Sequence, residues 1–305
     1  MRIAFVGLPL AALLLREDGH EIVWAGICRK EAIGTRRLTR ALGAANVAVL
    51  PDLAHVAESV RKRAPDLIVS WFWTRNVPAS FRGVARLGAI GVHPSLLPRH
   101  RGPDPYFWAI VHGDAVTGLT AHELEDAYDT GAILAKRELA IDPSWSAWRL
   151  AKRLDRPSLA LLRDTVRAYA AGAPPRPVEQ DETLATDAPQ PTDDDLEIRW
   201  TDSAAAIVRR VRAASPWPGA FTAIGDADVT LTEVRASTKD RRSFAVLEPG
   251  EAVVRADGIA IGRAGDDSIE LLRGRAEDDE GEHDLDAGAL AAWVGRPPNV
   301  GRGAT

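Results

Sequence analysis

In the first part of the chain, short runs that are almost wholly apolar alternate with longer segments in which apolar residues recur every three or four positions. The short runs are typical of strands buried on both faces of a sheet, and the longer segments are typical of amphipathic helices. The alternation predicts a parallel α/β sheet. The predicted strands are 2–6, 21–25, 47–50 and 66–71, and the predicted helices are 9–18, 29–42 and 54–63.

The pattern that follows predicts a further buried strand, a helix, a hairpin and a long helix. Pro105 suits the first turn of a helix, and two runs of alternating polarity after it are typical of paired strands. Ser144 is expected to cap the long helix. The predicted elements are a strand at 89–92, a helix at 105–112, strands at 117–124 and 132–141, and a helix that ends near residue 171.

The second half of the chain has a different pattern of apolar and polar residues. Residues 173–195 are rich in proline, aspartate and threonine, have weak apolar periodicity, and are predicted to form a linker. A helix at 204–214 and several short strands follow, and the tail after Arg275 is acidic with one short helix. We therefore expect an α/β protein with an N-terminal parallel-sheet domain at 1–172 and a smaller β-rich domain at 196–305.

Composition and charge narrow the class of protein. A single cysteine among 305 residues excludes an intramolecular disulfide and any multi-cysteine metal site. The formal net charge of −5 gives no general support for nucleic-acid binding. The N-terminal segment lacks the layout of a signal peptide, and no apolar run reaches membrane-spanning length. We expect a cytoplasmic protein without a membrane partner.

His93 and Asp129 are the candidate functional residues. His93 follows a predicted buried strand at its carboxyl end, where open α/β sheets place their ligand sites, and a stiff loop framed by prolines follows it. Asp129 lies in a turn that can return toward His93. His100, His112 and His122 lack the short helical pairing of zinc-binding histidines, so no metal is expected.

Several segments carry a resemblance to a known family. HPSLLPRHRG begins at His93, HGDAVTGLT begins at His112, DTG begins at Asp129, and RAASPWPGAF begins at Arg212. In this order they resemble the folate-dependent formyltransferases, a family that includes methionyl-tRNA formyltransferase, sugar N-formyltransferases and the hydrolase domain of 10-formyltetrahydrofolate dehydrogenase. The resemblance implies a Rossmann-like catalytic domain, an OB-like C-terminal domain, 10-formyltetrahydrofolate as formyl donor, and no metal.

The resemblance also implies roles for individual residues. Formyl transfer passes through a tetrahedral oxyanion, which needs a hydrogen-bond donor, and the attacking amine needs a carboxylate to manage its proton. His93 is expected to be the donor and Asp129 the carboxylate. Flat aromatic rings after the fourth predicted strand suit the flat pterin ring. The residues expected to contact folate are Phe72, Trp73, Ser95, Leu96, Leu97, Pro98, Glu125, Tyr128 and Thr130.

Gly91 departs from the family pattern, which has an asparagine two residues before the histidine. The loss of such a neutral donor can lower a rate by about 10²–10³-fold. A water, His112, Asn76 or the acceptor itself could fill the gap. The hydrolase domain of the dehydrogenase also lacks this asparagine. Three functions therefore stay open: formyl transfer to an amine, hydrolysis of 10-formyltetrahydrofolate to formate, and folate binding without catalysis.

As the expected acceptor, a small amine is slightly favoured over initiator tRNA. From Asp195 to Thr305, 14 Arg and Lys oppose 20 Asp and Glu, a net charge of −6. Binding of tRNA normally requires clustered basic residues. Two local basic groups, at 29–40 and at 209–212, keep tRNA as an alternative.

Overall fold

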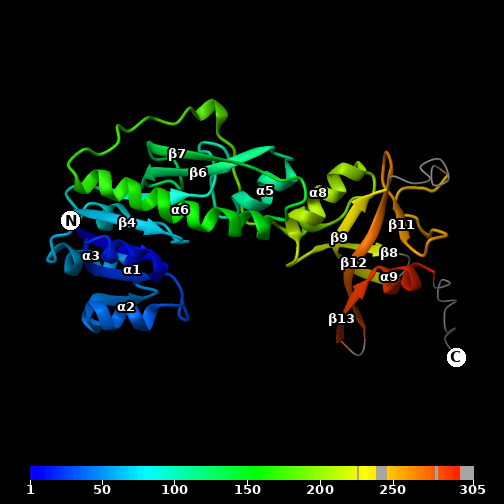
Figure 1. Cartoon of the computed structure of the whole chain (residues 1–305), viewed down its shortest axis with the longest axis horizontal. Helices are drawn as coiled ribbons and strands as arrows, with labels where there is room; N and C mark the ends of the chain where they lie inside the picture. Colours follow the sequence, from blue (N-terminus) through cyan, green and yellow to red (C-terminus); the bar gives the residue numbers. More distant parts are fainter. Residues whose placement is uncertain (225–226, 238–245, 279–280, 296–305) are drawn as a thin grey trace. The chain divides into compact units, whose positions relative to one another are not determined.

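The computed structural model describes residues 1–224, 227–237, 246–278 and 281–295. The chain divides into two compact units (Figure 1). Unit 1 comprises residues 1–105, 116–140 and 151–189, and unit 2 comprises residues 106–115, 141–150 and the described residues from 190 onward. Two short segments from the first half of the sequence therefore belong with the second unit.

A seven-stranded sheet forms the centre of unit 1. Its strand order is β3-β2-β1-β4-β5-β6-β7, in which the first five strands pair in parallel and β6 runs antiparallel to both of its neighbours. The predicted Rossmann-like parallel sheet is confirmed. The strands are β1 (Arg2–Gly7), β2 (Glu21–Ile27), β3 (Val47–Val49), β4 (Leu67–Trp71), β5 (Ala89–His93), β6 (Val116–Glu123) and β7 (Ile133–Ala140).

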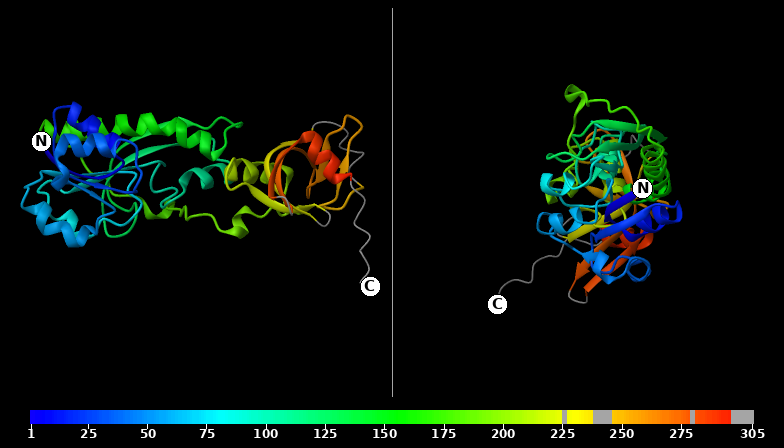
Figure 2. Two further views of the ribbon diagram at one scale, coloured as in Figure 1. Left: turned by 90° about the horizontal axis from the view of Figure 1, so that it is seen from below. Right: turned by 90° about the vertical axis from the view of Figure 1, so that its left-hand side faces the viewer.

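Helices cover both faces of this sheet (Figure 2). On one face, Val6 belongs to a buried cluster with Leu53 and Phe81, from the third and fourth helices. On the other, the indole N–H of Trp71 donates to Ser158 Oγ of the sixth helix at 3.0 Å. The helices in this part of the sequence are α1 (Pro9–Glu17), α2 (Thr35–Leu42), α3 (Leu53–Arg61), α4 (Ala79–Arg82), α5 (Pro105–Val111) and α6 (Ala147–Ala170), with 3-10 turns at Ala44–Asn46 and Glu182–Leu184. Of these, α5 belongs to unit 2 from Tyr106 onward.

The long helix α6 begins later than the sequence predicts. Ser144 does not cap it, because the Ser144 hydroxyl donates to Asp142 Oδ1 at 2.6 Å. Ser146 takes the capping role, and its Oγ accepts the backbone N–H of Arg149 at 3.2 Å. Both serines suit such a position, so the turn at Asp142 decides between them. The helix predicted at 29–42 is likewise shorter, since α2 covers only its second half.

Unit 2 contains an antiparallel sheet of six strands within the described residues, in the order β10-β11-β12-β9-β8 with β13 paired to β12. The predicted β-rich second unit is confirmed. Its elements are α7 (Asp193–Leu196), α8 (Ala204–Ala214), β8 (Ala220–Ile224), β9 (Ala227–Ala236), β10 (Ala252–Val254), β11 (Ala260–Arg263), β12 (Ser268–Asp278), β13 (Gly281–Asp286) and α9 (Ala287–Val294). In the described part of the chain, no helix combines the length and the apolar character needed to cross a membrane.

Candidate active site

His93 ends β5 at the carboxyl edge of the parallel strands. The strand pairs with β6, where His93 lies opposite Thr120, and the histidine is only 6% exposed. Its Nε2 lies 2.8 Å from the carbonyl oxygen of His100, and its Nδ1 lies 3.3 Å from Asp129 Oδ2. Both ring nitrogens therefore face acceptors.

Thr120 fixes the loop that follows β5. Its hydroxyl donates to the carbonyl of Ser95 at 2.8 Å and accepts the backbone N–H of Leu97 at 3.0 Å. Ser95 and Leu97 are fully buried, so they shape the loop instead of offering surface to a ligand. Leu96 is half-buried and lies over Gly118, where an added Cβ would come within 2.6 Å of its side chain.

Asp129 approaches His93 from the turn after β6. Its backbone is left-handed, with φ of 58°, and its Oδ2 accepts the backbone N–H of Gly102 at 2.9 Å as well as facing His93. Its side chain is 17% exposed. The structure thus brings the two predicted catalytic residues together in one corner of unit 1.

The contacts of His93 suit a ring that donates hydrogen bonds. Only an N–H at Nε2 satisfies the carbonyl of His100, and an N–H at Nδ1 would face the Asp129 carboxylate. The separation of 3.3 Å between Nδ1 and Oδ2 is longer than that of a typical charge-assisted hydrogen bond. The Nδ1–H can therefore be shared with a second acceptor next to Asp129.

His122 is a third member of this group, and the sequence interpretation did not assign it to the site. It lies on β6 opposite Gly91, its Nδ1 is 2.8 Å from the carbonyl oxygen of Glu123, and its Nε2 is 3.6 Å from Asp129 Oδ1. Burial lowers the pKa of His122, against the pull of Asp129, and this favours the neutral form of its ring. The sequence did carry a signal for His122: it lies two residues after Thr120 in a predicted strand, so the two side chains are on the same face.

We expect His122 to make stability depend on pH. Its pKa is lowered in the folded chain, so the unfolded chain binds the proton more readily, and the free energy of unfolding should fall as pH drops below 6.5. In a His122→Asn variant the fall should be shallower, by at most about 1.4 kcal/mol per pH unit. Urea unfolding across a pH series measures both slopes. His20, whose pKa burial also lowers, remains in both proteins; parallel slopes would contradict the assignment.

Gln180 supports the site from the segment that follows α6. Its Nε2 donates to the carbonyl of Asp129 at 2.8 Å and to the carbonyl of Gly131 at 2.7 Å, and its Oε1 accepts two N–H groups of Arg101. Every hydrogen-bonding atom of this amide is used, and the residue is 9% exposed. The residue falls within the predicted linker, where no local pattern marks it.

Replacing Gln180 with alanine should lower the free energy of unfolding by about 2 kcal/mol, because it leaves buried polar groups unpaired on both sides. Turnover should also fall, since the turn that carries Asp129 loses its support. Chemical denaturation and steady-state kinetics measure the two effects. Glu179→Ala is the matched control, because Glu179 is the exposed neighbour. Equal stability of the two variants would show that the amide does not hold the turn.

The residues predicted to contact folate lie on three segments, and a hydrogen bond joins the loop at 72–76 to the turn at 125–130. Asp126, in the turn at 125–130, accepts hydrogen bonds from Arg82 at 2.6 Å and from Asn76 at 3.3 Å. Phe72 and Trp73 belong to the loop before Asn76. In the turn, Tyr128 is 58% exposed, Thr130 donates to the Ala127 carbonyl, and Glu125 packs against Gly131. Pro98 is buried in the loop after His93.

Trp73 also lines a cavity of ≈ 390 Å³ between this loop and the start of α3. Arg75 stacks over its ring at 4.6 Å, and its indole Nε1 is buried without a hydrogen-bond partner in the described part of the chain. Of the residues predicted to contact folate, Trp73 alone appears among those lining this cavity. The cavity adjoins the turn at 125–130 through Asn76, which lines the cavity and donates to the carbonyl of Asp126.

Gly91 faces an occupied space. An added Cβ would lie 3.0 Å from Leu124 Cδ2 and 3.6 Å from Ser70 Cβ. Leu124 in turn packs against the buried cluster of unit 1. A larger side chain at this position would require Leu124 to move.

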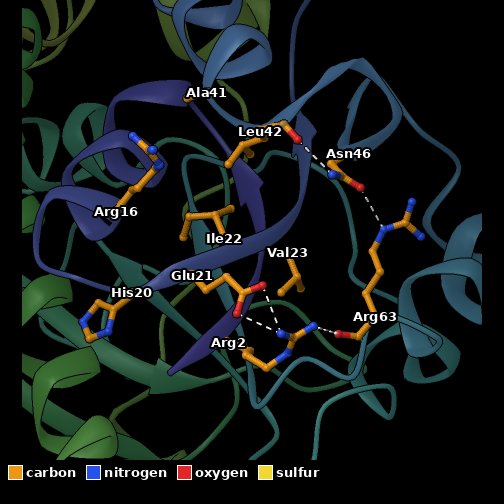
Figure 3. Close-up of a pocket in the computed structure, with 10 residues that line it drawn as sticks. All are labelled: Arg2, Arg16, His20, Glu21, Ile22, Val23, Ala41, Leu42, Asn46 and Arg63. Atoms are coloured by element: carbon orange, nitrogen blue, oxygen red, sulfur yellow. Dashed lines mark hydrogen bonds and ion pairs between the residues drawn. The ribbon is translucent and has the colours of Figure 1, made fainter.

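A basic pocket lies at the opposite, amino edge of the strands (Figure 3). It contains Arg2 and Arg63, but both side chains are engaged by the protein: Arg2 pairs with Glu21 at 2.8 Å, and Arg63 Nε donates to Asn46 Oδ1 at 3.1 Å. The first bond ties β1 to β2, and the second ties the segment after α3 to the 3-10 turn at Ala44–Asn46. The pocket therefore has a structural role at the edge away from His93.

A doubly wound sheet with a buried histidine–aspartate pair at its carboxyl edge defines an α/β enzyme. The formyl transferase family model matches residues 31–166, and the model of the formyl transferase C-terminal domain matches residues 191–282. The methionyl-tRNA formyltransferase of Anaeromyxobacter dehalogenans (strain 2CP-C) is 34% identical over 94% of this chain and 96% of its own length. This chain belongs to the formyltransferase family, and it is a transferase.

Solved structures agree with the fold. HypX from Aquifex aeolicus in complex with tetrahydrofolic acid superposes with a TM-score of 0.63 at 20% identity, over 96% of this chain and 47% of that one. An N-formyltransferase from Helicobacter canadensis, in complex with folinic acid and dTDP-3-aminofucose, superposes with a TM-score of 0.66 at 13% identity, over 88% of this chain and 98% of that one.

Proposed function

We propose that this enzyme transfers the formyl group of 10-formyltetrahydrofolate to an amine. The observation that carries the proposal is the contact between His93 Nδ1 and Asp129 Oδ2 at 3.3 Å. Attack of the amine on the formyl carbon forms a C–N bond and an oxyanion. Collapse then breaks the bond to N10 of the folate, which takes up a proton. An N–H of the His93 ring stabilises the oxyanion, and Asp129 accepts the proton of the amine directly or through water.

The folate donor is supported by the pairing of two segments. The loop at Phe72 and Trp73 is linked through Asp126 to the turn that carries Asp129. A pterin bound between these segments would bring its formyl group near His93 and Asp129. The two structural neighbours described above were solved with tetrahydrofolic acid and with folinic acid.

A Phe72→Ala plus Trp73→Ala variant should bind folate at least about tenfold more weakly, since each ring offers a flat apolar face to the pterin. Isothermal titration with tetrahydrofolate gives the affinity. Val116→Ala is a matched control, because Val116 is an exposed apolar residue on β6 that does not line the Trp73 cavity. Unchanged affinity in the double variant would move the folate pocket elsewhere.

Two acceptor classes are supported by different observations. The net charge of −6 from Asp195 to Thr305 favours a small amine over tRNA. The relative of 34% identity is named for methionyl-tRNA, which favours the initiator tRNA. Incubation with 10-formyltetrahydrofolate and each acceptor decides between them: salt-sensitive formylation of methionyl-tRNA with no reaction of small amines would exclude the small acceptor.

Hydrolysis is the second candidate function, and Gly91 favours it. Gly91 has no side chain, and Leu124 occupies the space beside it. Position 91 therefore supplies no group that could orient the formyl oxygen or the amine. Water could then take the place of the amine. Formate released at the same rate with and without amines would assign hydrolysis, and formate release that requires an amine, or product formylation, would assign transfer. Binding of folate with neither product would leave a silent binding module.

A further inference from the structure

One face of α8 lines a cavity of ≈ 430 Å³ within unit 2. Arg209 and Arg212 are three residues apart on this helix, so their side chains lie on the same face. The rest of the wall is largely apolar and includes Ile110, Ile141, Pro143 and Val208. Helices α5 and α8, which contribute to this wall, are labelled in Figure 1.

Both arginines are held in place by backbone carbonyls. Arg209 Nε donates to the carbonyl of Val111, and Arg212 Nε donates to the carbonyl of Trp145, each at 3.0 Å. An added Cβ at Gly113 would lie 3.0 Å from Arg209 Cδ, so the glycine lets that side chain lie against the turn. The guanidinium groups are thus oriented by single bonds from Nε, and within the described residues no hydrogen bond or ion pair engages their terminal nitrogens.

The charge of this pair is not neutralised by an ion pair. Burial, together with the charge of Arg209, lowers the pKa of Arg212, and Asp142 only partly opposes the shift. The Asp142 carboxylate is engaged by Ser144. Asp114 also lines the cavity. Among the described residues, the bonds from Nε to the two backbone carbonyls are the polar contacts of Arg209 and Arg212, and neither arginine is in an ion pair. Arg210, one residue away, differs, because it pairs with Asp202 at 3.2 Å.

We propose that this cavity binds a phosphate monoester with a compact apolar body. Two planar guanidinium groups with unused N–H groups match the oxygens of a phosphate. Because each guanidinium is already held in one orientation, it loses little entropy when the ligand binds. The apolar wall accounts for the body of the ligand, because a fully hydrated anion would gain nothing from it. This site is independent of the proposed folate chemistry in unit 1, since every residue that lines it belongs to unit 2.

Titration of the full-length protein with phenyl phosphate tests the site. We expect saturable binding, and weaker binding of inorganic phosphate, which lacks the apolar body. An Arg209→Gln plus Arg212→Gln variant should bind phenyl phosphate at least about tenfold more weakly. An Arg199→Gln plus Arg210→Gln variant is the matched control, because it removes two charges outside the cavity and should change the affinity less than about twofold.

Several outcomes would overturn the proposal: no saturable binding of phenyl phosphate, unchanged binding by the double variant at 209 and 212, or an equal loss in the control. Binding of a 5′-phosphorylated ribonucleotide oligomer without binding of phenyl phosphate would assign the arginines to nucleic acid instead. If the glutamine variant does not fold, an Arg209→Lys plus Arg212→Lys variant keeps the charge but loses the planar forks. It should still bind at least about tenfold more weakly, and full affinity in it would also reject the site.

Discussion

Replacement of His93 by alanine is expected to lower kcat for formyl transfer by about 10³-fold while leaving the affinity for folate within about threefold. The variant removes the ring nitrogens that face Asp129 and the carbonyl of His100. In the proposed mechanism a donor from this ring is needed only when the oxyanion forms, so its loss should appear in kcat and not in ground-state binding. Single-turnover kinetics with 10-formyltetrahydrofolate and titration with tetrahydrofolate separate the two effects.

His55→Ala is the control for this substitution, because His55 is an exposed histidine on α3. Its kcat should equal that of the wild type. A His93→Ala enzyme that keeps more than about a tenth of wild-type kcat would remove the histidine from the chemistry, since donors of this kind are worth at least 10²-fold. Weakened folate binding together with unchanged single-turnover rate would instead assign His93 to the folate pocket.

Asp129→Asn should lower kcat by about 10²–10³-fold, because the amide keeps an oxygen for the Gly102 N–H but cannot accept the proton of the amine. It also removes the carboxylate charge that lies 3.3 Å from His93 Nδ1. Since the two residues act as one unit, the double variant with His93→Ala should be little slower than either single variant. Steady-state kinetics of the four proteins completes the cycle.

The control is Asp187→Asn, because Asp187 is an exposed carboxylate near Arg101 and its loss changes the net charge equally. Additive losses in the double variant, with the two factors multiplied, would mean that His93 and Asp129 act independently. Wild-type activity of Asp129→Asn would leave the carboxylate with a purely structural role at the turn.

The sequence predicted the sheet well because buried parallel strands are nearly continuous apolar runs, as at 2–6 and 66–71. It also pointed to His93 and Asp129, since one ends a strand and the other lies in a short turn after a strand. The contacts of Gln180 could not be predicted from the sequence, because they join residues about fifty positions apart and no local pattern marks this amide. The start of α6 depended on a choice between two serines that propensity alone does not make.

The grouping of residues 106–115 and 141–150 with the second unit was hidden for a similar reason. Both segments follow the local pattern of a helix and a turn, which is the same in either unit. Two arginine contacts from α8, to Val111 and to Trp145, link these segments to the second unit. Such pairings depend on tertiary structure and leave no periodic trace in the sequence.

The segment after α6 limits how this protein could recombine with others. Besides Gln180, its Thr186 and Ala188 exchange backbone hydrogen bonds with Pro98 and Arg101 in the loop that follows His93. A chimaera joined at the end of α6 would therefore replace part of the scaffold of its own active site. An inherited module that retains catalysis should extend to Pro189, so crossover points in natural or laboratory shuffling are expected beyond that residue.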